Sequence, residues 1–484
     1  MAEEKLPAGA SDASTSSDAA VSDVDNAALN RRVTRKCDIR LVPILGGLYF
    51  TAFLDRVNIA NAKLNGFEAD LHMPDNGYNT AIWIFFLSFV LLEVPCNIFL
   101  NWHRMQPNYW LGLMMFLLGI VSMCQGLTQS AGGLYACRFI MGALEGSLGP
   151  GAALLMGQYY RRHEFGPRFA CFFVCALAST AVSSFLAYAI GHMEGVHGIR
   201  SWRWIFILEG IASILYAALS FFIIPPFPKD AKFLTEEERR CLLERLERER
   251  GGEKVSMRDI RWTKILFNWK VWLATFIYFC GDLSSSSNVS FSPTILTQLN
   301  WKASQAQIHQ IPIYCVAIVT SIIAHILSAR AGVRFPFILI GCSVSLIGWS
   351  IQIAQLTHNP SVRYFGLFMI SAGASLTMPL SVVWLNNNLE GRPEKAVAAA
   401  LQMGFGNSAN FVSSNMFIKR EAPYYWTAFT VGTTFAVLGI VATLVCAALL
   451  ARENRALDEK EKRGEATDGT EDGFSKGTKF RNTL

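Results

Sequence analysis

Residues 111–129 read LGLMMFLLGIVSMCQGLTQ, and none of these side chains carries a charge. Residues 169–190 and 422–450 are also free of charged side chains. An unbroken apolar run of about 18 or more residues is typical of a helix that crosses a membrane. A buried helix of a large soluble protein can be apolar all round but is rarely that long. A series of such runs therefore indicates a polytopic membrane protein.

The rest of the chain contains further segments long enough to cross a hydrocarbon core of about 30 Å. The first series lies near residues 41–58, 79–100, 110–127, 134–158, 169–191 and 204–224. The second series lies near residues 271–291, 310–328, 335–354, 364–385, 397–417 and 424–450. We therefore predict an all-α polytopic fold with twelve transmembrane helices in two six-helix halves.

Charged residues make up 17% of the chain, whereas an ordinary soluble domain carries about 25%. Many of them lie in residues 225–268, between the two series. Pro225, Pro226 and Pro228 end the sixth helix, since proline removes a backbone donor. Thr235, followed by three glutamates, reads as the N-cap of a short amphipathic surface helix. This stretch is predicted to be a linker between the halves.

The domain organisation follows from these boundaries. We expect the halves at residues 37–224 and 269–452, with the linker at 225–268. Residues 1–36 and 453–484 are rich in small, polar or charged side chains and are predicted to be disordered tails, because they cannot bury enough apolar surface. Lys and Arg are frequent before the first span, between spans four and five and in the linker, and sparse in the alternate loops. The positive-inside rule then places both tails and the linker in the cytoplasm.

Ionisable side chains inside the spans are the candidates for function, because each costs about 2.5–3.5 kcal/mol or more at the bilayer centre. Such a side chain therefore needs a partner or an aqueous cavity. They are Asp55, Arg56, Glu93, Arg138, Glu145, Glu209, Asp282 and His325. For Glu93 and Glu209 a structural role is equally plausible, and His325 reads as a packing residue.

Spans one and four supply an arginine and an acid each. Arg138 and Glu145 are seven residues apart, so they share a helix face about 10 Å apart along the axis. Asp55 and Arg56 are adjacent and point about 100° apart. The planar fork of arginine suits a carboxylate ligand, and a buried carboxylate can bind a transported proton. The alternative is that Arg56–Glu145 and Asp55–Arg138 are ion pairs that only fix helix packing.

Asp282 lies near the middle of span seven. The run of four serines and Asn288 that follows it lowers the hydrophobicity of this span. It suggests a wetted stretch that faces a cavity and where the helix could break.

Several motifs resemble the anion:cation symporter branch of the major facilitator superfamily. Residues 55–63 (DRVNIANAK) resemble its span-one signature, and residues 138–146 (RFIMGALEG) with Pro150-Gly151 its span-four signature. Residues 93–97 (EVPCN) and 202–206 (WRWIF) are similar to its spans two and six. Residues 233–239 and 384–391 are similar to the fungal allantoate permease subgroup, which includes nicotinate and vitamin permeases. The resemblance covers residues 37–452.

This resemblance implies proton-coupled symport of a small organic anion by alternating access. By the same comparison, Arg56, Arg138 and Asn407 are expected to bind the substrate. Asp55 and Glu145 are expected to bind the proton. Asp282 is predicted to be a further proton-coupling acid because it lies near the middle of its span. The loops 101–105 and 328–330 depart from the family pattern: the first lacks the usual glycine and acid, and the second lacks an acid before Arg330. These departures weaken the expected contacts that hold the two halves together on the cytoplasmic side.

Other classes of protein fit the sequence less well. A membrane enzyme would show clustered histidines, a metal motif or a phosphate loop, and the 8 histidines here are scattered. An exporter of a secondary metabolite or drug on the same fold, and a nutrient sensor without flux, remain open. We expect no cofactor, no catalytic or metal-binding residue and no nucleic-acid partner, because the basic residues flank the membrane. The expected partners are the anion, protons and lipid, for a monomer in the plasma membrane.

Overall fold

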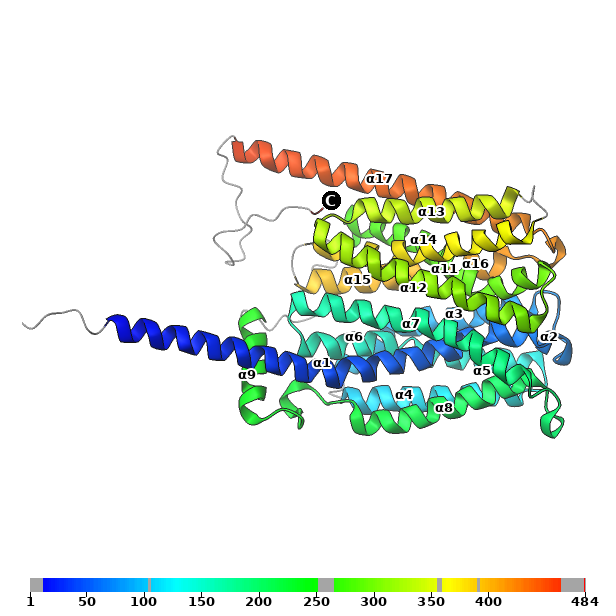
Figure 1. Ribbon diagram of the computed structural model, residues 1–484, viewed down its shortest axis with the longest axis horizontal. Helices are drawn as coiled ribbons and strands as arrows, with labels where there is room; N and C mark the ends of the chain where they lie inside the picture. The colour runs from blue at the N-terminus through cyan, green and yellow to red at the C-terminus, as the bar shows by residue number, and fades with distance from the viewer. Residues whose placement is uncertain are drawn as a thin grey trace, which may run out of the picture.

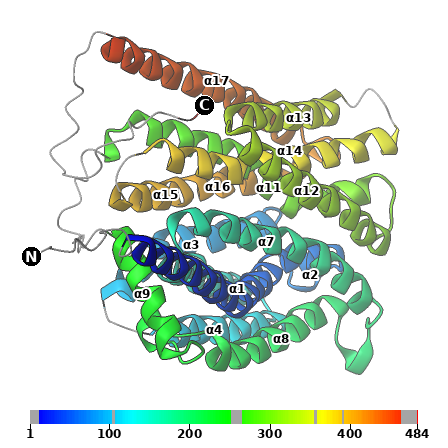
Figure 2. The same ribbon diagram turned by 60° about the vertical axis from the view of Figure 1, so that its left-hand side comes forward.

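The computed structural model describes residues 12–102, 106–250, 265–354, 359–389, 392–462 and 483. Across these residues every regular element is a helix. The helices form two bundles that lie side by side with their long axes roughly parallel (Figure 1; Figure 2). The predicted all-α fold in two halves is confirmed.

The N-terminal half consists of α1 (Asp12–Leu64), α2 (Phe67–Asp70), α3 (Gly77–Trp102), α4 (Pro107–Leu127), α5 (Ala131–Glu145), α6 (Leu148–Tyr159), α7 (Arg162–Gly191) and α8 (Ser201–Ile223). The C-terminal half consists of α11 (Trp269–Gln298), α12 (Ala303–Ala331), α13 (Phe335–Ala354), α14 (Pro360–Asn387), α15 (Arg392–Asn407), α16 (Ala409–Met416) and α17 (Trp426–Lys462). The linker helix α9 (Glu236–Arg250) crosses one end of the N-terminal half (Figure 1). We call this the α9 end of the molecule and the opposite end the α2 end.

Nine helices in the described parts of the chain are long and apolar enough to cross a membrane. Two further long helices, α3 and α11, are not long and apolar enough by this measure in the described residues. In α11, Asp282, Asn288 and the serines between them lower the mean hydropathy. With the broken α15 and α16, the described helices account for the twelve predicted spans, so the chain is a multi-pass membrane protein.

The helices at the two chain ends extend beyond the predicted spans. The first helix begins at Asp12, within the predicted tail, and α17 continues to Lys462. Val33 and Cys37 are fully buried in a cluster that includes Leu242 and Leu246 of α9. This contact between distant segments explains why the helix continues here. Residues 1–11, 463–482 and 484 of the predicted tails lie outside the described residues.

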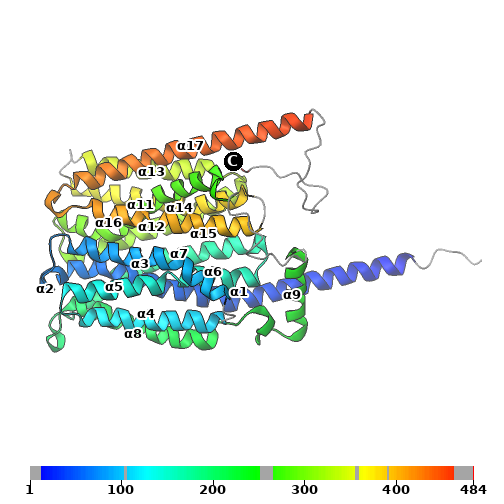
Figure 3. The same ribbon diagram turned by 180° about the vertical axis from the view of Figure 1, so that it is seen from behind.

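Two predicted spans are divided into consecutive helices. Span four consists of α5 and α6, which follow one another along nearly one line (Figure 3). Pro150 explains the interruption, since its ring lacks an N–H and clashes with the carbonyl of Gly146 four residues before. Span eleven is divided at Ser408 into α15 and α16. By contrast, α11 is one continuous helix through the serine run, where Ser286 and Ser287 donate to carbonyls of their own helix.

Side-chain contacts between the halves gather at the α2 end. The Tyr78 hydroxyl donates to the Ser290 carbonyl (2.6 Å), and the Asn79 amide donates to the Phe417 carbonyl (3.0 Å). Lys419 pairs with Asp75 at 3.1 Å near the surface. Further in, Ser184 of α7 donates to Gln310 of α12 (3.3 Å). These contacts hold the two bundles together at this end.

Within each half, some helices meet backbone to backbone. A Cβ added at Gly142 of α5 would lie 2.1 Å from the Phe85 carbonyl oxygen of α3. In the C-terminal half, a Cβ at Gly373 of α14 would lie 2.4 Å from the Gly341 carbonyl oxygen of α13. Glycine is needed at both positions because any side chain would separate the helices. Close packing of this kind, through small residues, is typical of helices in membranes.

Candidate functional site

Arg56 and Glu145 form a buried ion pair in the N-terminal half. The Nη2 and Nε atoms of Arg56 lie 2.6 Å and 2.7 Å from Oε1 of Glu145. The Arg56 side chain is 16% exposed and that of Glu145 only 1%. The second oxygen of Glu145, Oε2, is buried without a hydrogen-bond partner. Both contacts from Arg56 are therefore made to Oε1 of Glu145, and Oε2 is available to accept a further hydrogen bond.

Phenylalanine rings surround the Arg56 guanidinium. Its Cζ lies 4.3 Å from the ring centroid of Phe53 and 5.0 Å from that of Phe89. Phe85 and Phe86 add rings at 5.5 Å and 5.8 Å. Each cation–π contact stabilises the charge by about 0.5–2 kcal/mol or more, depending on desolvation. The rings hold the arginine in place and exclude water while leaving its donors free to exchange one carboxylate for another.

Arg138 lies deeper than Arg56 and is 1% exposed. Its Nη1 donates to the Arg56 carbonyl oxygen at 3.4 Å, and its Nε and Nη2 have no hydrogen-bond partner. A buried arginine with two unpartnered donors is energetically costly. The Nε and Nη2 donors of Arg138 could therefore bind an anion.

Asp55 does not pair with Arg138 in the way that one interpretation of the sequence proposed. Its Oδ1 accepts from Ser122 of α4 (2.7 Å), and its Oδ2 accepts from Ser213 of α8 (2.5 Å). The side chain is completely buried. One hydroxyl donor therefore satisfies each of its two oxygens. The sequence did not single out either serine, because both come from other helices.

The C-terminal half contributes Asp282 and Asn410. Asn410 Nδ2 donates to Asp282 Oδ2 at 2.7 Å, and both residues are buried. Asn407, which the family resemblance singled out, is partly buried at the end of α15, and its carbonyl accepts from Asn410. The polar run NSAN at residues 407–410 is the signal that could have pointed to Asn410.

A second polar network lies behind this site, inside the N-terminal half. Asn58 donates to Glu209, and Ser183 donates to Asn58 Oδ1 at 2.9 Å. Asn61 continues the chain by donating to Ser183 at 2.9 Å. Glu209 keeps its other oxygen unpartnered. This network joins α1, α7 and α8, and it gives Glu209 a structural role that the sequence left open.

The titratable groups of the site show no arrangement for a metal ion. In the parts of the chain that the structure describes, no group of three or more His, Cys, Asp or Glu side chains could hold one. The ionisable groups of this site are the two arginines and the buried carboxylates described above.

Comparison with known proteins identifies relatives of the chain. The family model described as Major Facilitator Superfamily matches residues 45–414. A fungal protein described as MFS transporter prlL (strain NRRL 50135) is 31% identical over 401 residues, which cover 81% of this chain and 80% of that protein. The high-affinity nicotinic acid transporter of Saccharomyces cerevisiae is 28% identical over 430 residues, which cover 88% of this chain and 79% of that protein.

Solved structures give the same fold at lower identity. A bacterial homologue of the human lysosomal transporter Spinster, in an inward-facing and occupied conformation, has a TM-score of 0.61 and 13% identity. The match covers 84% of this chain and 94% of that protein. The unoccupied inward-facing structure has a TM-score of 0.59.

Proposed function

The chain belongs to the major facilitator superfamily, and from this premise we propose that it is a proton-coupled symporter of a small organic anion. The observation that carries the proposal is the Arg56–Glu145 pair, buried among phenylalanine rings inside the N-terminal half. Fungal transporters of this superfamily are similar over most of the chain, and one of them is a nicotinic acid transporter. This relative supports an organic anion as the substrate.

The substrate carboxylate and the Glu145 carboxylate compete for the same arginine. A substrate carboxylate that accepts from the fork of Arg56 takes the place of Glu145. Glu145 then stays buried without its ion-pair partner Arg56, which favours proton uptake by Glu145. Arg138, with its unpartnered Nε and Nη2, offers a second cationic partner for the anion. Asp55 and Asp282 are the further acids through which a proton can pass, and Asn407 completes the polar lining.

The conformation fits one stage of alternating access. Contacts between the halves at the α2 end, such as Tyr78–Ser290 and Lys419–Asp75, close that side. We place the α9 end in the cytoplasm, because the basic residues of the chain gather there. With this orientation, the contacts at the α2 end close the side of the molecule that faces away from the cytoplasm.

The proposal includes the organisation of the chain and its location. Residues 37–224 and 269–452 are the two halves that move against each other, and residues 225–268 connect them on the cytoplasmic side. The protein works as a monomer in the plasma membrane and imports its substrate. Export of a metabolite on the same fold is the alternative, and the direction of flux under an imposed pH gradient separates the two.

Glu145→Gln tests the coupling. Glutamine imitates the protonated acid, so the variant should bind substrate and exchange it across proteoliposome membranes. It should lose accumulation driven by a pH gradient, because it cannot release a proton. The assay compares counterflow with gradient-driven uptake of labelled nicotinate, pantothenate and allantoate.

Glu237→Gln is the matched control, since Glu237 is exposed on α9 and remote from the site. It should keep both activities. Concentrative uptake by the Glu145 variant would remove this residue from the mechanism and leave Asp55 or Asp282 as the proton carrier. A wild-type protein that binds these anions without any flux would support a sensor.

A further inference from the structure

A basic hollow at the α9 end lies outside the transport site. It has a volume of about 280 Å³ and is lined by Asn30, Arg31, Thr34, Arg35, Asp38, Arg161, Glu164 and Arg245. These residues come from α1, from the start of α7 and from α9, three segments far apart in the sequence. Four arginines and two acids line it, which leaves an excess of two positive charges.

Both acids of the hollow are already engaged. Asp38 accepts from Arg168 Nε and Nη2 at 2.5 Å and 2.8 Å, a bidentate pair. Glu164 accepts from the Arg161 backbone N–H (3.0 Å) and from Thr34 (3.4 Å), and lies 3.6 Å from Arg245 Nη2. One carboxylate therefore serves several donors, and the arginines keep unused hydrogen-bonding capacity.

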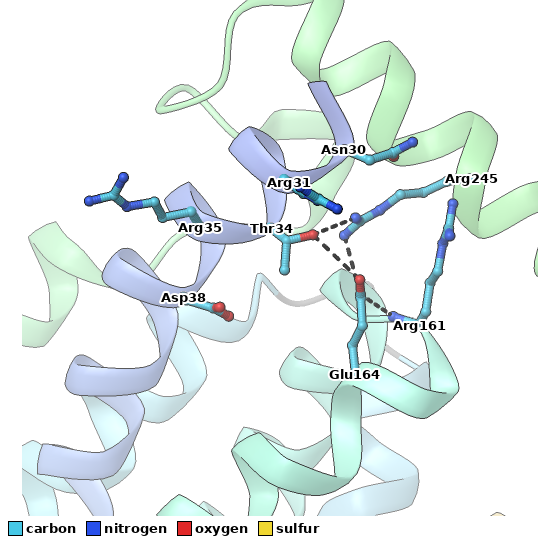
Figure 4. A pocket seen from close by; sticks show the side chains of 8 residues that line it. All are labelled: Asn30, Arg31, Thr34, Arg35, Asp38, Arg161, Glu164 and Arg245. Carbon is cyan, nitrogen blue, oxygen red and sulfur yellow. Dashed lines mark hydrogen bonds and ion pairs between the residues drawn. The ribbon is translucent and has the colours of Figure 1, made fainter. Parts of the chain in front are cut away.

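Arg245 is the anchor of this hollow. It is 4% exposed, donates to Thr34 Oγ1 (2.8 Å) and to the Tyr159 carbonyl (3.2 Å), and leaves Nε without a partner. Arg161 also leaves Nε buried and unpartnered. Figure 4 shows the Arg31 and Arg245 guanidinium groups pointing towards the same space, whereas Arg35 points away from it. Like charges gathered around one carboxylate repel each other unless an anion lies between them.

We propose that this hollow binds a phosphate group, through Arg31, Arg161 and Arg245. Guanidinium forks match the oxygens of phosphate and bind it with charge-assisted hydrogen bonds. Asn30 adds an amide at the rim, because its Oδ1 accepts from Cys241 and leaves the NH₂ group as a donor. A bound phosphate would join the linker helix α9 to α1 and α7, independently of the transport cycle.

The phosphate has two possible sources. The hollow lies beside the basic start of the first span, where Arg32, Lys36 and Arg40 also lie. Basic clusters next to a membrane span attract anionic lipid headgroups. A soluble phosphate compound of the cytoplasm presents the same group. The test therefore needs a lipid arm and a soluble arm.

The full-length protein is purified and its thermal unfolding is followed in detergent and in nanodiscs. In detergent the probe is inorganic phosphate, added against chloride at equal ionic strength. In nanodiscs the probe is phosphatidylinositol 4-phosphate in phosphatidylcholine, compared with phosphatidylcholine alone. An increase in Tm in the first arm identifies a soluble ligand, and an increase only in the second identifies a headgroup. No increase in either arm overturns the proposal.

Three variants make the test specific to the hollow. Arg31→Gln and Arg161→Gln each remove one fork, so phosphate affinity should fall about tenfold or more, the loss expected for a charge-assisted hydrogen bond. Arg40→Gln is the matched control, because it removes the same charge from an exposed position of the same helix and Arg40 does not line the hollow. An equal loss in the Arg40 variant would show nonspecific charge attraction and contradict the site.

Discussion

The central site is the region around Arg56 and Arg138, where charged side chains lie in an apolar interior. Arg56 keeps its charge in a hydrophobic interior because Glu145 neutralises it and Phe53 and Phe89 cover its faces. Arg138 has no such compensation for two of its donors. The two arginines therefore differ in their surroundings: Arg56 has an ionic partner, whereas two donors of Arg138 have none.

Arginine-to-lysine variants test whether the fork itself is required. Arg56→Lys and Arg138→Lys keep the charge and lose the planar geometry, so substrate affinity should fall about tenfold or more in each. Titration of the purified protein with labelled substrate measures this directly. Arg40→Lys, an exposed change on the same helix as Arg56, is the control and should bind normally. Normal binding by the Arg138 variant would make that residue a packing element.

The sequence analysis singled out the charged residues of this region and one neutral residue, Asn407, but not the other neutral residues that contact the acids. An arginine or acid inside an apolar span stands out, and Asp55, Arg56, Arg138, Glu145 and Asp282 were predicted in this way. Ser122, Ser213 and Asn410 contact these acids from other helices. Small polar side chains are common in membrane spans, so their role depends on which helices are neighbours. The sequence alone does not contain that arrangement.

The linker helix α9 is held to the N-terminal half by a glutamate. Thr235 and Glu238 form the predicted capping arrangement: the Thr235 N–H donates to Glu238 (3.0 Å), and Thr235 Oγ1 accepts from the Glu238 N–H (3.3 Å). Glu238 also accepts from Lys36 of α1 at 2.7 Å and pairs with Arg32 at 3.2 Å. The cap was visible in the sequence, whereas the contact with α1 was not. This contact joins the part of α1 that precedes its membrane span to the linker helix.

The docking of α9 should weaken in acid. Burial acts to raise the pKa of Glu238, but hydrogen bonds from Lys36 and Thr235 and the charge of Arg32 outweigh it and lower the pKa below its ordinary value of 4.5. A lowered folded-state pKa means that the stabilisation is complete above pH 4.5 and is lost as the pH falls through the folded pKa. Hydrogen exchange of the α9 amides, corrected for intrinsic rates, should show this loss.

Glu238→Gln should remove this pH dependence. It should also reduce α9 protection at neutral pH by about 5–30-fold, which corresponds to about 1–2 kcal/mol. Glu244→Gln is the control, because Glu244 pairs only with Arg240 of its own helix at 2.9 Å in the described contacts. Unchanged protection in the Glu238 variant would mean that apolar packing alone holds α9.

At the scale of the whole molecule, the sequence predicted the two halves and their spans closely. The ninth predicted span coincides with α13, and most others differ from the helices by a few residues at each end. The helix breaks at Gly146–Ser147 and at Ser408 were not predicted, because hydropathy is insensitive to backbone geometry. The expected break in α11 is absent, since its serines donate to their own backbone.

The topology of the molecule can be tested with two exposed positions at opposite ends. Lys232 lies beside α9, and Arg420 lies at the α2 end. Each residue is replaced by cysteine, as Lys232→Cys and Arg420→Cys, in a cysteine-reduced background. An impermeant thiol reagent should label Arg420→Cys in intact cells and should label Lys232→Cys only after permeabilisation. Labelling of Lys232→Cys from outside would contradict the cytoplasmic linker.

The glycine contacts between helices have a mechanical consequence. The Gly142 backbone lies against the Phe85 carbonyl of α3, and the Gly373 backbone against the Gly341 carbonyl of α13, so these helices are held at a very short distance. We expect each such helix pair to move as one rigid body. Bending during transport must therefore concentrate where side chains separate the backbones, as at Ser184 and Gln310 between α7 and α12. A spin label on α3 and another on α5 should keep a constant separation while labels on α7 and α12 move apart.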